Sequence, residues 1–598
     1  MVGQPGEILV PLSELEAHGI TGRSLRSFQL TNQGRRVPFG RGRTPDDQPA
    51  LVFQAEPIST LYTDENVYLL SRGPAPRPRV PLSIAGEPVL PGFTRIEKSV
   101  LYLPSAPLGS DPWLWDFLWD GWPWPDPSWD PLAGHFDLPG LGGDVEGDVE
   151  VKVRFLAYSD HEHRVDVTLN GVFLGTLDHS GKGLAVLSGS VPAAGLRVTG
   201  NELTLGYTSD ASEPGDFGWM YVDGLDIGLP GLLVGGPGEL RAIAEYDPSL
   251  PRLRRAEYLI VTHRDFVAQA ETIAAAKRAE GLSTVVVDVE RAYDRFSSGL
   301  TEAAAVRELV RRAARGGRLR FVLLVGDDTF DYRDDVGMGA VGFVPSLYAW
   351  DDVFGLVPSE NRYADVDDDQ RPDVAIGRLP VKTPEEAALF AEKIVRQTTL
   401  LAESAGRHVM VVDNQGPRDL SYVDEARSVV AQLPPDSTVS WSNIADGVSV
   451  ARADLVSAWE QGAMLTHYFG HGGPEVWADE SLVATWAVPT LTASARPTVL
   501  FTWTCQTQWY QYLWSDTVNE ALLLAPDGAV ASFGPVGITS PADQKELYSR
   551  VYRPLFQEKL SLGEAILRAK REAAEARPAS RVVVEGFALL GDPALQLP

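Results

Sequence analysis

Apolar and polar positions alternate in short runs up to residue 240, and Gly, Asn, Asp and Pro separate the runs. Such alternation predicts half-buried β-strands, because successive side chains of a strand point to opposite faces of the sheet. HRVDVTLNGVFLGTL (163–177) also contains an Asn-Gly pair that predicts a hairpin turn. We expect a small β domain at residues 1–93 and a jelly-roll-like β-sandwich at 94–235, with a Gly/Pro-rich boundary after it.

The pattern changes at about residue 250, where continuous apolar runs of strand length begin to alternate with helical segments. Examples of the runs are EYLIVTH (257–263), HVMVVDN (408–414) and TVLFTWTC (498–505). Continuous apolar strands that alternate with helices indicate a mostly parallel sheet with both faces covered. The rhythm restarts once, which predicts two α/β subdomains, at residues 250–404 and 405–598.

Two of these apolar runs end in residues that can carry chemistry. AMLTHYFGHGG (463–473) contains His471 among glycines, and TVLFTWTC ends at Cys505, the single cysteine of the chain. If the two strands are parallel neighbours, imidazole and thiol share one edge of the sheet, where ligands bind in such folds. A lone cysteine in an apolar strand can also be a small buried hydrophobic residue. The glycine-flanked histidine favours the functional interpretation.

Composition and charge exclude several classes of protein. A net charge of −29 argues against a nucleic-acid partner, because phosphate binding needs clustered Lys and Arg. One cysteine excludes an intramolecular disulfide framework and a cysteine-rich metal site. We expect no membrane span, because no run of 18 apolar residues occurs. The first residues lack the pattern of a signal peptide, although a mature chain could have lost one.

Two further clusters are candidate ligand sites. The loop DVDDDQRPD places four carboxylates close together, those of Asp365, Asp367, Asp369 and Asp373. Such a group suits calcium, which binds oxygen ligands. The usual loop glycine is missing, and a solvated acidic turn is the alternative. His467 lies four residues before His471, but the strand pattern predicts a packed core histidine there.

The stretch PWLWDFLWDGWPWPDPSW (112–129) concentrates aromatic side chains that could stack on sugars or contact a partner surface. We favour a structural role, in which the indoles seal the sandwich: Trp113, Trp115, Trp119, Trp122, Trp124 and Trp129.

Four motifs of the second half resemble the catalytic region of the gingipain family of cysteine peptidases, which belongs to the caspase-like clan: YFGHGGPEVW, LFTWTCQTQWYQ, NEALLLAPDGAVASFGPVG and GFALLGDPALQL. FVLLVGDDTFDYR and RPDVAIGRLPV in the preceding half resemble the matching family segments. The resemblance implies N-terminal all-β domains followed by a caspase-like α/β catalytic unit of two subdomains with mostly parallel sheets.

The resemblance also implies roles for individual residues. His471 would be the general acid/base and Cys505 the nucleophile, with the backbone N–H groups of Gly472 and Cys505 holding the oxyanion. A third, acidic member follows the strand at 408–412; the strict position holds Asn414, and we expect Asp413 to take the role. The acidic group that binds a basic P1 side chain in arginine-specific members matches Glu425, with Asp424 beside it, and a solvated helix face is the alternative. The family's calcium binding supports a metal in the acidic loop.

Three functions follow as hypotheses. The first is a cysteine endopeptidase that acts outside the cytoplasm or at the cell surface, as the resemblance implies. The second keeps the same site but transfers the cleaved protein to an amine, as sortase-like relatives do. The third is an adhesin whose β-sandwich binds glycans and whose protease-like unit is silent.

Overall fold

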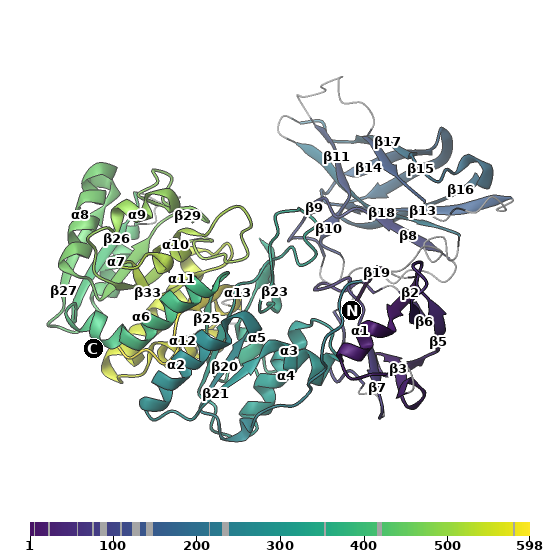
Figure 1. Cartoon of the computed structure of the whole chain (residues 1–598). Coiled ribbons are helices and arrows are strands. Elements are labelled where there is room, and N and C mark those ends of the chain that lie inside the picture. Colours follow the sequence, from purple (N-terminus) through teal and green to yellow (C-terminus); the bar gives the residue numbers. More distant parts are fainter. Residues whose placement is uncertain are drawn as a thin grey trace. The chain divides into compact units, whose positions relative to one another are not determined.

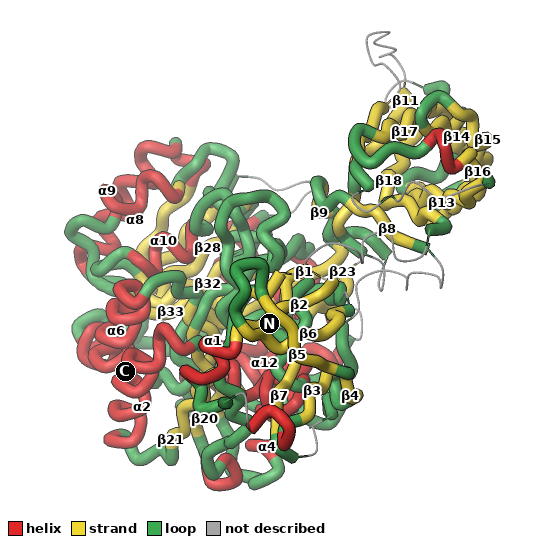
Figure 2. Tube along the Cα trace, turned by 45° about the vertical axis from the view of Figure 1, so that its right-hand side comes forward, coloured by secondary structure: helices red, strands yellow, loops and turns green. Residues whose placement is uncertain are grey.

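The computed structural model describes residues 1–4, 6–21, 24–56, 58–73, 77–83, 93–107, 111–121, 132–138, 141, 147–213, 216–229, 239–351, 354–414, 421–577 and 581–598. Internal contacts divide the chain into two units, residues 1–77 with 83–246 and residues 78–82 with 247–598. We describe each unit by itself, and the division into four domains stays a prediction. Figure 2 shows that strands dominate the first unit, whereas helices and strands alternate in the second.

The first unit begins with short antiparallel strands that follow the predicted alternation. Two three-stranded sheets, ordered β2-β6-β5 and β4-β3-β7, pack around a small core that includes Ile8, Leu30 and Phe53. Their strands are β2 (Gly6–Pro11), β3 (Gln29–Asn32), β4 (Arg35–Val37), β5 (Phe39–Arg43), β6 (Pro49–Ala55) and β7 (Tyr68–Ser71), with the helix α1 (Leu12–Ala17) after β2 and a β1 (Val2–Gln4)–β19 (Glu239–Leu240) pair.

A β-sandwich forms the rest of this unit (Figure 1). One sheet has the order β11-β18-β13-β16, with β8 (Thr94–Glu97) also paired to β18, and the other has the order β12-β17-β14-β15. Inward residues such as Val153, Val167 and Leu225 are fully buried between them. The strands are β11 (Asp116–Gly121), β12 (Leu132–Phe136), β13 (Asp148–Ala157), β14 (Glu162–Leu169), β15 (Val172–Ser180), β16 (Gly183–Pro192), β17 (Asn201–Ser209) and β18 (Phe217–Ile227).

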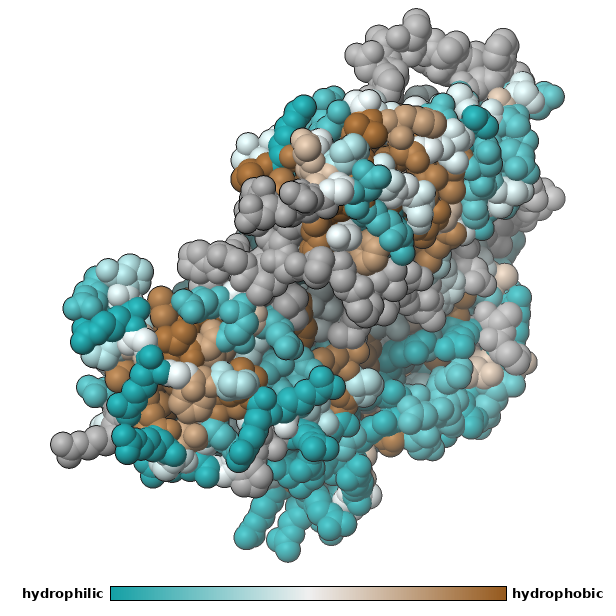
Figure 3. All heavy atoms as spheres, turned by 90° about the vertical axis from the view of Figure 1, so that its right-hand side faces the viewer, coloured by the Kyte–Doolittle hydropathy of each residue, from teal (hydrophilic) through white to brown (hydrophobic). Residues whose placement is uncertain are grey.

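The tryptophan-rich stretch supplies part of the sandwich, as expected for a structural role. Trp113, in the short strand β10 (Trp113–Leu114) that pairs with β9 (Leu101–Tyr102), and Trp115 are buried, and Trp119 is half-buried. Trp122, Trp124 and Trp129 lie outside the described residues. Figure 3, in its upper part, shows hydrophobic residues among the hydrophilic ones on the surface of the sandwich. Phe173, Leu184 and Val186 are exposed apolar side chains of β15 and β16.

A single mixed sheet organises the second unit. In the described part of the chain its ten strands have the order β21-β20-β22-β25-β34-β33-β32-β28-β26-β27. Their bounds are β20 (Tyr258–Thr262), β21 (Thr284–Asp288), β22 (Phe321–Val325), β25 (Ala375–Leu379), β26 (Arg407–Val412), β27 (Thr438–Asn443), β28 (Leu465–Phe469), β32 (Thr498–Trp503), β33 (Ala529–Pro535) and β34 (Phe587–Leu590).

The two predicted α/β subdomains are therefore the two halves of one sheet. They join at β34, which is parallel to β25 through the single pair Arg378↔Leu590 and antiparallel to β33. All other neighbours in the sheet are parallel. The halves consequently run in opposite directions, and their carboxyl ends lie at opposite edges of the sheet.

Helices cover both faces of this sheet, which explains its continuous apolar strands (Figure 1). In β26, Val409 and Val411 belong to one core with α2, α6 and α8, whereas Met410 and Val412 belong to another core with α7, α11 and α12. The main helices are α2 (Val267–Ala279), α4 (Ala303–Ala314), α6 (Pro384–Ala402), α7 (Tyr422–Val430), α8 (Val448–Gln461), α10 (Val518–Leu524), α11 (Pro541–Tyr552), α12 (Leu562–Ala576) and α13 (Arg581–Gly586).

Among the described residues, no helix has both the length and the apolar composition that crossing a bilayer requires.

Candidate active site

The register of two neighbouring strands places His471 and Cys505 at one edge of the sheet. Strands β28 and β32 are parallel and adjacent, with Phe469 paired to Trp503 at their carboxyl ends. His471 follows Phe469 by two positions, and Cys505 follows Trp503 by two positions. The two residues therefore leave the sheet at the same level, from adjacent strands, as the sequence pattern predicted.

Glycines let the two loops pack against each other. A Cβ on Gly472 would lie 2.6 Å from Oγ1 of Thr504 and 3.2 Å from the carbonyl oxygen of Cys505, closer than real side chains pack. A Cβ on Gly470 would collide with Asp413 and Tyr468. The backbone at Gly472 is thus packed against Thr504 and Cys505, and glycine is the residue that fits at positions 470 and 472.

The thiol of Cys505 is half-buried and contacts the start of the segment that leads into α11. Its Sγ donates to the carbonyl oxygen of Thr539 at 3.4 Å, and the N–H of Thr539 points to Sγ at 3.5 Å. Burial raises the pKa of the Cys505 thiol, the hydrogen bonds of Thr539 lower it, and the charge of Asp351 raises it further, with a net increase. The free protein therefore holds Cys505 as a neutral thiol at neutral pH.

Asp413 follows β26 and fixes the backbone of the histidine loop. Its Oδ2 accepts a hydrogen bond from the N–H of His471 at 2.8 Å, and its Oδ1 accepts one from the N–H of Asn414 at 2.7 Å. Burial raises the pKa of its carboxyl, and the two backbone hydrogen bonds oppose that rise. The side chain of Asn414 donates to Glu480. Asp413 thus lies beside His471, and its role as third catalytic member stays a prediction.

A tyrosine that no sequence motif singled out contacts the imidazole. The ring of Tyr422, the first residue of α7, meets the ring of His471 edge to face, with centroids 5.8 Å apart at 89°. Its hydroxyl lies 3.5 Å from Nε2 of His471. Burial raises the pKa of Tyr422 to about 12, and the charge of Asp413 adds to the rise, so this phenol is neutral at neutral pH.

The two acidic residues that were expected to bind substrate lie in the first turn of α7 and have different partners. Asp424 pairs with Arg427 at 3.2 Å, and both side chains are 68% exposed. Glu425 is mostly buried; its carboxylate accepts from Lys545 of α11 at 3.1 Å and from the hydroxyl of Tyr548. Of the two, only Glu425 bridges α7 and α11, the helix that follows the contact with Cys505.

The loop after Cys505 is held by buried polar side chains. Tyr510 donates to Glu360, which also pairs with Arg378 at 2.8 Å, and all three are buried. Asn519 of α10 donates to Thr502 of β32 at 3.0 Å and to Ser532 of β33 at 3.1 Å. Buried polar groups with satisfied partners specify one arrangement of a core. These hydrogen bonds explain why the motifs LFTWTCQTQWYQ and NEALLLAPDGAVASFGPVG contain buried polar residues.

An aromatic cluster follows Cys505 in the chain. Trp509 meets Phe354 edge to face with centroids 5.2 Å apart, and Tyr512 lies between Trp509 and Trp514. Trp514 is 58% exposed. Phe354 lies between the hairpin strands β23 (Tyr348–Asp351) and β24 (Gly355–Pro358) and donates its N–H to Asp351. The segment that follows Cys505 in the chain thus carries exposed apolar surface at Trp514.

The acidic loop brings three of its four predicted ligands together. One carboxylate oxygen each of Asp365, Asp367 and Asp373 lies within 4.8 Å of the others, an arrangement that fits a cation with oxygen ligands. The fourth predicted ligand, Asp369, instead pairs with Arg371 at 2.7 Å.

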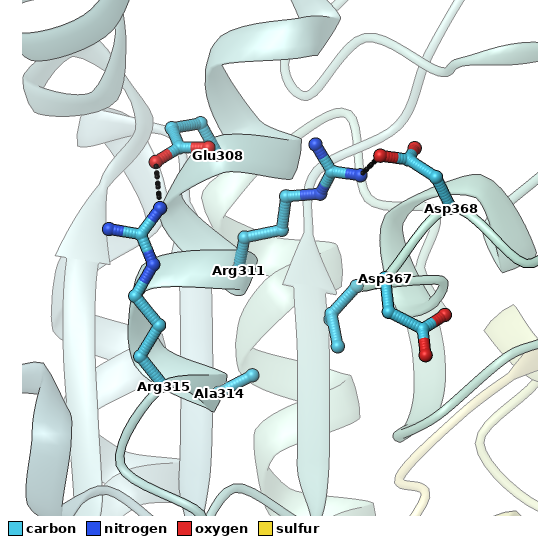
Figure 4. Close-up of a pocket in the computed structure, with 7 residues that line it drawn as sticks. Glu308, Arg311, Ala314, Arg315, Asp367 and Asp368 are labelled. Atoms are coloured by element: carbon cyan, nitrogen blue, oxygen red, sulfur yellow. Dashed lines mark hydrogen bonds and ion pairs between the residues drawn. The ribbon is translucent and has the colours of Figure 1, made fainter.

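Basic residues of α4 border the same loop and pair with two of its carboxylates, those of Asp365 and Asp368. Figure 4 shows the pocket there, in which Asp368 turns to Arg311 and the carboxylate of Asp367 points away from it. Arg307 pairs with Asp368 at 2.8 Å and with Asp365 at 3.2 Å. Protein cations therefore also contact the three-carboxylate group, because Arg307 pairs with Asp365 and Arg571 pairs with Asp373 at 2.9 Å.

His467 is a core residue, as the strand pattern predicted. It is fully buried, and its Nδ1 lies 2.9 Å from the hydroxyl of Tyr552.

Comparison with known proteins adds a family and a fold. The profile of peptidase family C25 matches residues 252–598. No curated protein matches the chain. Dimeric latent PorU from Porphyromonas gingivalis is similar with a TM-score of 0.54 and 14% identity, over 100% of this chain and 63% of that one. Its likeness confirms the predicted fold class, β domains followed by a caspase-like α/β unit.

Two structures of RgpB are also similar to part of the chain. Gingipain R (RgpB), described as an Arg-specific cysteine proteinase, has a TM-score of 0.49 and 18% identity over 57% of this chain and 78% of that one. A complex of the pro- and mature domains of RgpB from Porphyromonas gingivalis has a TM-score of 0.48 and 19% identity over 57% and 79%.

Proposed function

Because this chain belongs to peptidase family C25, the gingipain family of cysteine peptidases, we propose that Cys505 and His471 cleave proteins through an acyl-enzyme intermediate. The observation that carries the assignment is the strand register that brings these two residues to one edge of the sheet. The chemistry uses the thiol as nucleophile and the imidazole as general acid/base.

The proposed reaction has two steps. The sulfur attacks the peptide carbonyl carbon while its proton moves to His471, and the carbonyl electron pair moves onto oxygen. His471 then gives the proton to the leaving amine, the C–N bond breaks, and a thioester remains. Water attacks the thioester, its proton returns through His471 to the sulfur, and the carboxylic acid leaves. The N–H groups of Gly472 and Cys505 are the proposed donors to the oxyanion, and Asp413 holds the loop that carries Gly472 and His471.

Replacement of each member tests this scheme. Cys505→Ala should abolish peptide hydrolysis, because no other cysteine exists in the chain. His471→Ala should lower kcat by a factor of about 100 or more, because general acid/base catalysis contributes 10²–10⁴-fold. Iodoacetamide followed by mass analysis reports in parallel whether the thiol is accessible. Undiminished hydrolysis by Cys505→Ala would exclude the proposal.

A basic residue at P1 is the proposed preference, and Glu425 is the acidic group proposed to bind it. Glu425 lies on α7, three residues after the tyrosine that contacts His471, and Asp424 beside it is a solvent-exposed neighbour. Lys545 shows that a cation binds the Glu425 carboxylate. The kcat/KM ratio for Arg over neutral P1 peptides should fall in Glu425→Gln and stay unchanged in Asp424→Asn. Equal ratios in wild type for Arg, Lys and neutral residues would contradict a basic preference.

Transfer to an amine is the second outcome that the same thioester permits. Family resemblance supports it, because sortase-like relatives resolve the acyl-enzyme with an amine in place of water. Added glycine amide should then increase acyl-enzyme turnover and yield the amide product. An unchanged product distribution, with only the free acid formed, would assign the protein to hydrolysis.

We propose a calcium ion at Asp365, Asp367 and Asp373, with Asp369 outside the group. The mutual proximity of the three carboxylates supports the site, because hard cations bind carboxylate oxygens. Calcium should raise the Tm of the wild type over that in chelator. Asp367→Asn should reduce this difference, and Asp369→Asn should retain it. A Tm that chelator leaves unchanged would exclude the site.

The proposed substrate is a protein met outside the cytoplasm or at the cell surface, as the family resemblance implies. The β-sandwich is the proposed site for a glycan or another cell-surface partner. Binding of the full chain to a glycan array tests this role. A lack of binding to any glycan would contradict a glycan-binding β-sandwich.

A further inference from the structure

The geometry points to Tyr422 as the residue that holds the imidazole of His471 in its reactive orientation, in the place where a carboxylate would be expected. This inference rests on the proposed function, and it assigns to Tyr422 a positioning role rather than a catalytic one. It concerns the nitrogen Nε2, the one ring atom of His471 for which the structure gives a hydrogen-bond partner.

The contacts of Tyr422 show that its position is fixed. Its side chain is 5% exposed and belongs to the core that includes Met410, Val412 and Phe469, which lie on the strands that precede Asp413 and His471. Ser421 caps α7 by accepting a hydrogen bond from the N–H of Asp424, so the helix begins at a defined residue. The edge-to-face contact with the imidazole is therefore built on a packed helix start.

The nearby carboxylate groups are engaged elsewhere. Asp413 directs one oxygen to the backbone N–H of His471 and the other to that of Asn414. Glu480 accepts from the side chain of Asn414. Among the residues that the structure describes, no carboxylate is hydrogen-bonded to a ring nitrogen of His471. The hydroxyl of Tyr422 is accordingly the group available to set the tautomer.

The chemistry follows from which nitrogen carries the proton. When Nε2–H donates to the hydroxyl oxygen of Tyr422, the lone pair of the neutral ring is on Nδ1, which can then take the thiol proton. A neutral phenol oxygen stabilises the imidazolium less than a carboxylate would. The raised pKa of the buried Cys505 thiol agrees with a site that keeps the proton on sulfur until substrate binds. Proton transfer accompanies the attack on the substrate.

The matched experiment compares two Tyr-His pairs of the same unit. Tyr422→Phe removes the hydroxyl next to His471, and Tyr552→Phe removes the hydroxyl that contacts the core residue His467 at 2.9 Å. Two readouts are measured across pH, the kcat and KM for a peptide substrate and the rate of alkylation of Cys505 by iodoacetamide. The alkylation rate reports on the thiol and the imidazole even if the chosen peptide is not a substrate.

We expect Tyr422→Phe to lower kcat about 10- to 100-fold with little change in KM, because misplacing a general base forfeits part of its 10²–10⁴-fold contribution. The pH profiles of kcat and of alkylation should shift relative to wild type, and those of Tyr552→Phe should not. An unchanged pH profile in Tyr422→Phe, or equal changes in both variants, would overturn the inference. If the proposed peptidase function were wrong, the wild type would hydrolyse no peptide. The difference in alkylation rate between Tyr422→Phe and wild type could still be measured.

Discussion

Single residues decide how closely the loops that carry His471 and Cys505 approach each other. Gly472 lies against Thr504, Thr507 and Cys505, whereas a Cβ on the next residue, Gly473, would meet no atom within 4 Å. Gly472 and Gly473 can therefore be compared directly, because an alanine would clash at position 472 and fit at position 473.

The first prediction concerns this pair. Gly472→Ala should lower kcat/KM at least 10-fold, because the new methyl group pushes the histidine loop away from Cys505 and small displacements of reacting groups are costly. Gly473→Ala should remain within about twofold of wild type. Peptide hydrolysis and circular dichroism of both variants check the prediction, and equal activity of the two would contradict the proposed contact.

The sequence alone located His471 and Cys505, because residues that follow apolar strands reach the edge of a parallel sheet. It did not reveal Tyr422 or Thr539. Tyr422 opens a helix that comes from a distant part of the chain, and Thr539 contacts sulfur through its backbone, which leaves no trace in residue type. Asp413 was selected because the family resemblance implies an acidic residue after this strand, but its hydrogen bond to the backbone N–H of His471 could be seen only in the structure.

At the scale of elements, adjacent strands β26 and β28 carry a buried histidine pair. The rings of His408 and His467 stack with centroids 5.7 Å apart. Burial lowers the pKa of His408 to about 4, and burial together with the charge of His408 lowers the pKa of His467 well below its ordinary value. Both rings are therefore neutral in the folded protein at pH 5, whereas an unfolded chain binds protons there.

The second prediction follows from that difference. Unfolded histidine takes up its proton below about pH 6.5, so the folded state should lose roughly 1.4 kcal/mol per pH unit for each such histidine as pH falls from 6.5 toward 4. His408→Leu should reduce the dependence of Tm on pH between 7 and 5. Substitution of the exposed His18 by Gln serves as control, and a pH dependence in His408→Leu equal to that of wild type would disprove the assignment.

The order of elements was predictable, but their union into one sheet was not. Apolar runs and helical segments marked both α/β halves, because burial on two faces leaves a continuous hydrophobic signal. The halves join through one pair, Arg378↔Leu590, in the short strand FALL. Four residues carry no periodicity that distinguishes parallel from antiparallel pairing, so the reversal of direction between the halves could not be inferred.

At the scale of the whole second unit, the last residues of the chain tie the two halves together. Asp592 is fully buried and accepts from Lys277 of α2 at 2.7 Å, from Tyr258 of β20 at 2.8 Å and from Gln397 of α6 at 2.7 Å. Its position explains the Gly-Asp-Pro motif recognised near the end of the sequence.

The third prediction uses this anchor. Asp592→Asn should destabilise the second unit by about 3 kcal/mol, because removal of one partner leaves the buried ammonium of Lys277 with only the partly exposed Glu280. Asp424→Asn, which breaks the exposed pair with Arg427, should change stability by less than about 1 kcal/mol. Thermal unfolding of both variants tests the contrast, and equal shifts in Tm would contradict it.

The place of β34 between β25 and β33 has a consequence for biosynthesis. A nascent polypeptide that has emerged from the ribosome only as far as residue 586 already contains the imidazole, the thiol and the strands that bear them. It still lacks the strand that bridges the two halves. The ten-stranded sheet is therefore complete only once the chain has been synthesised past Phe587.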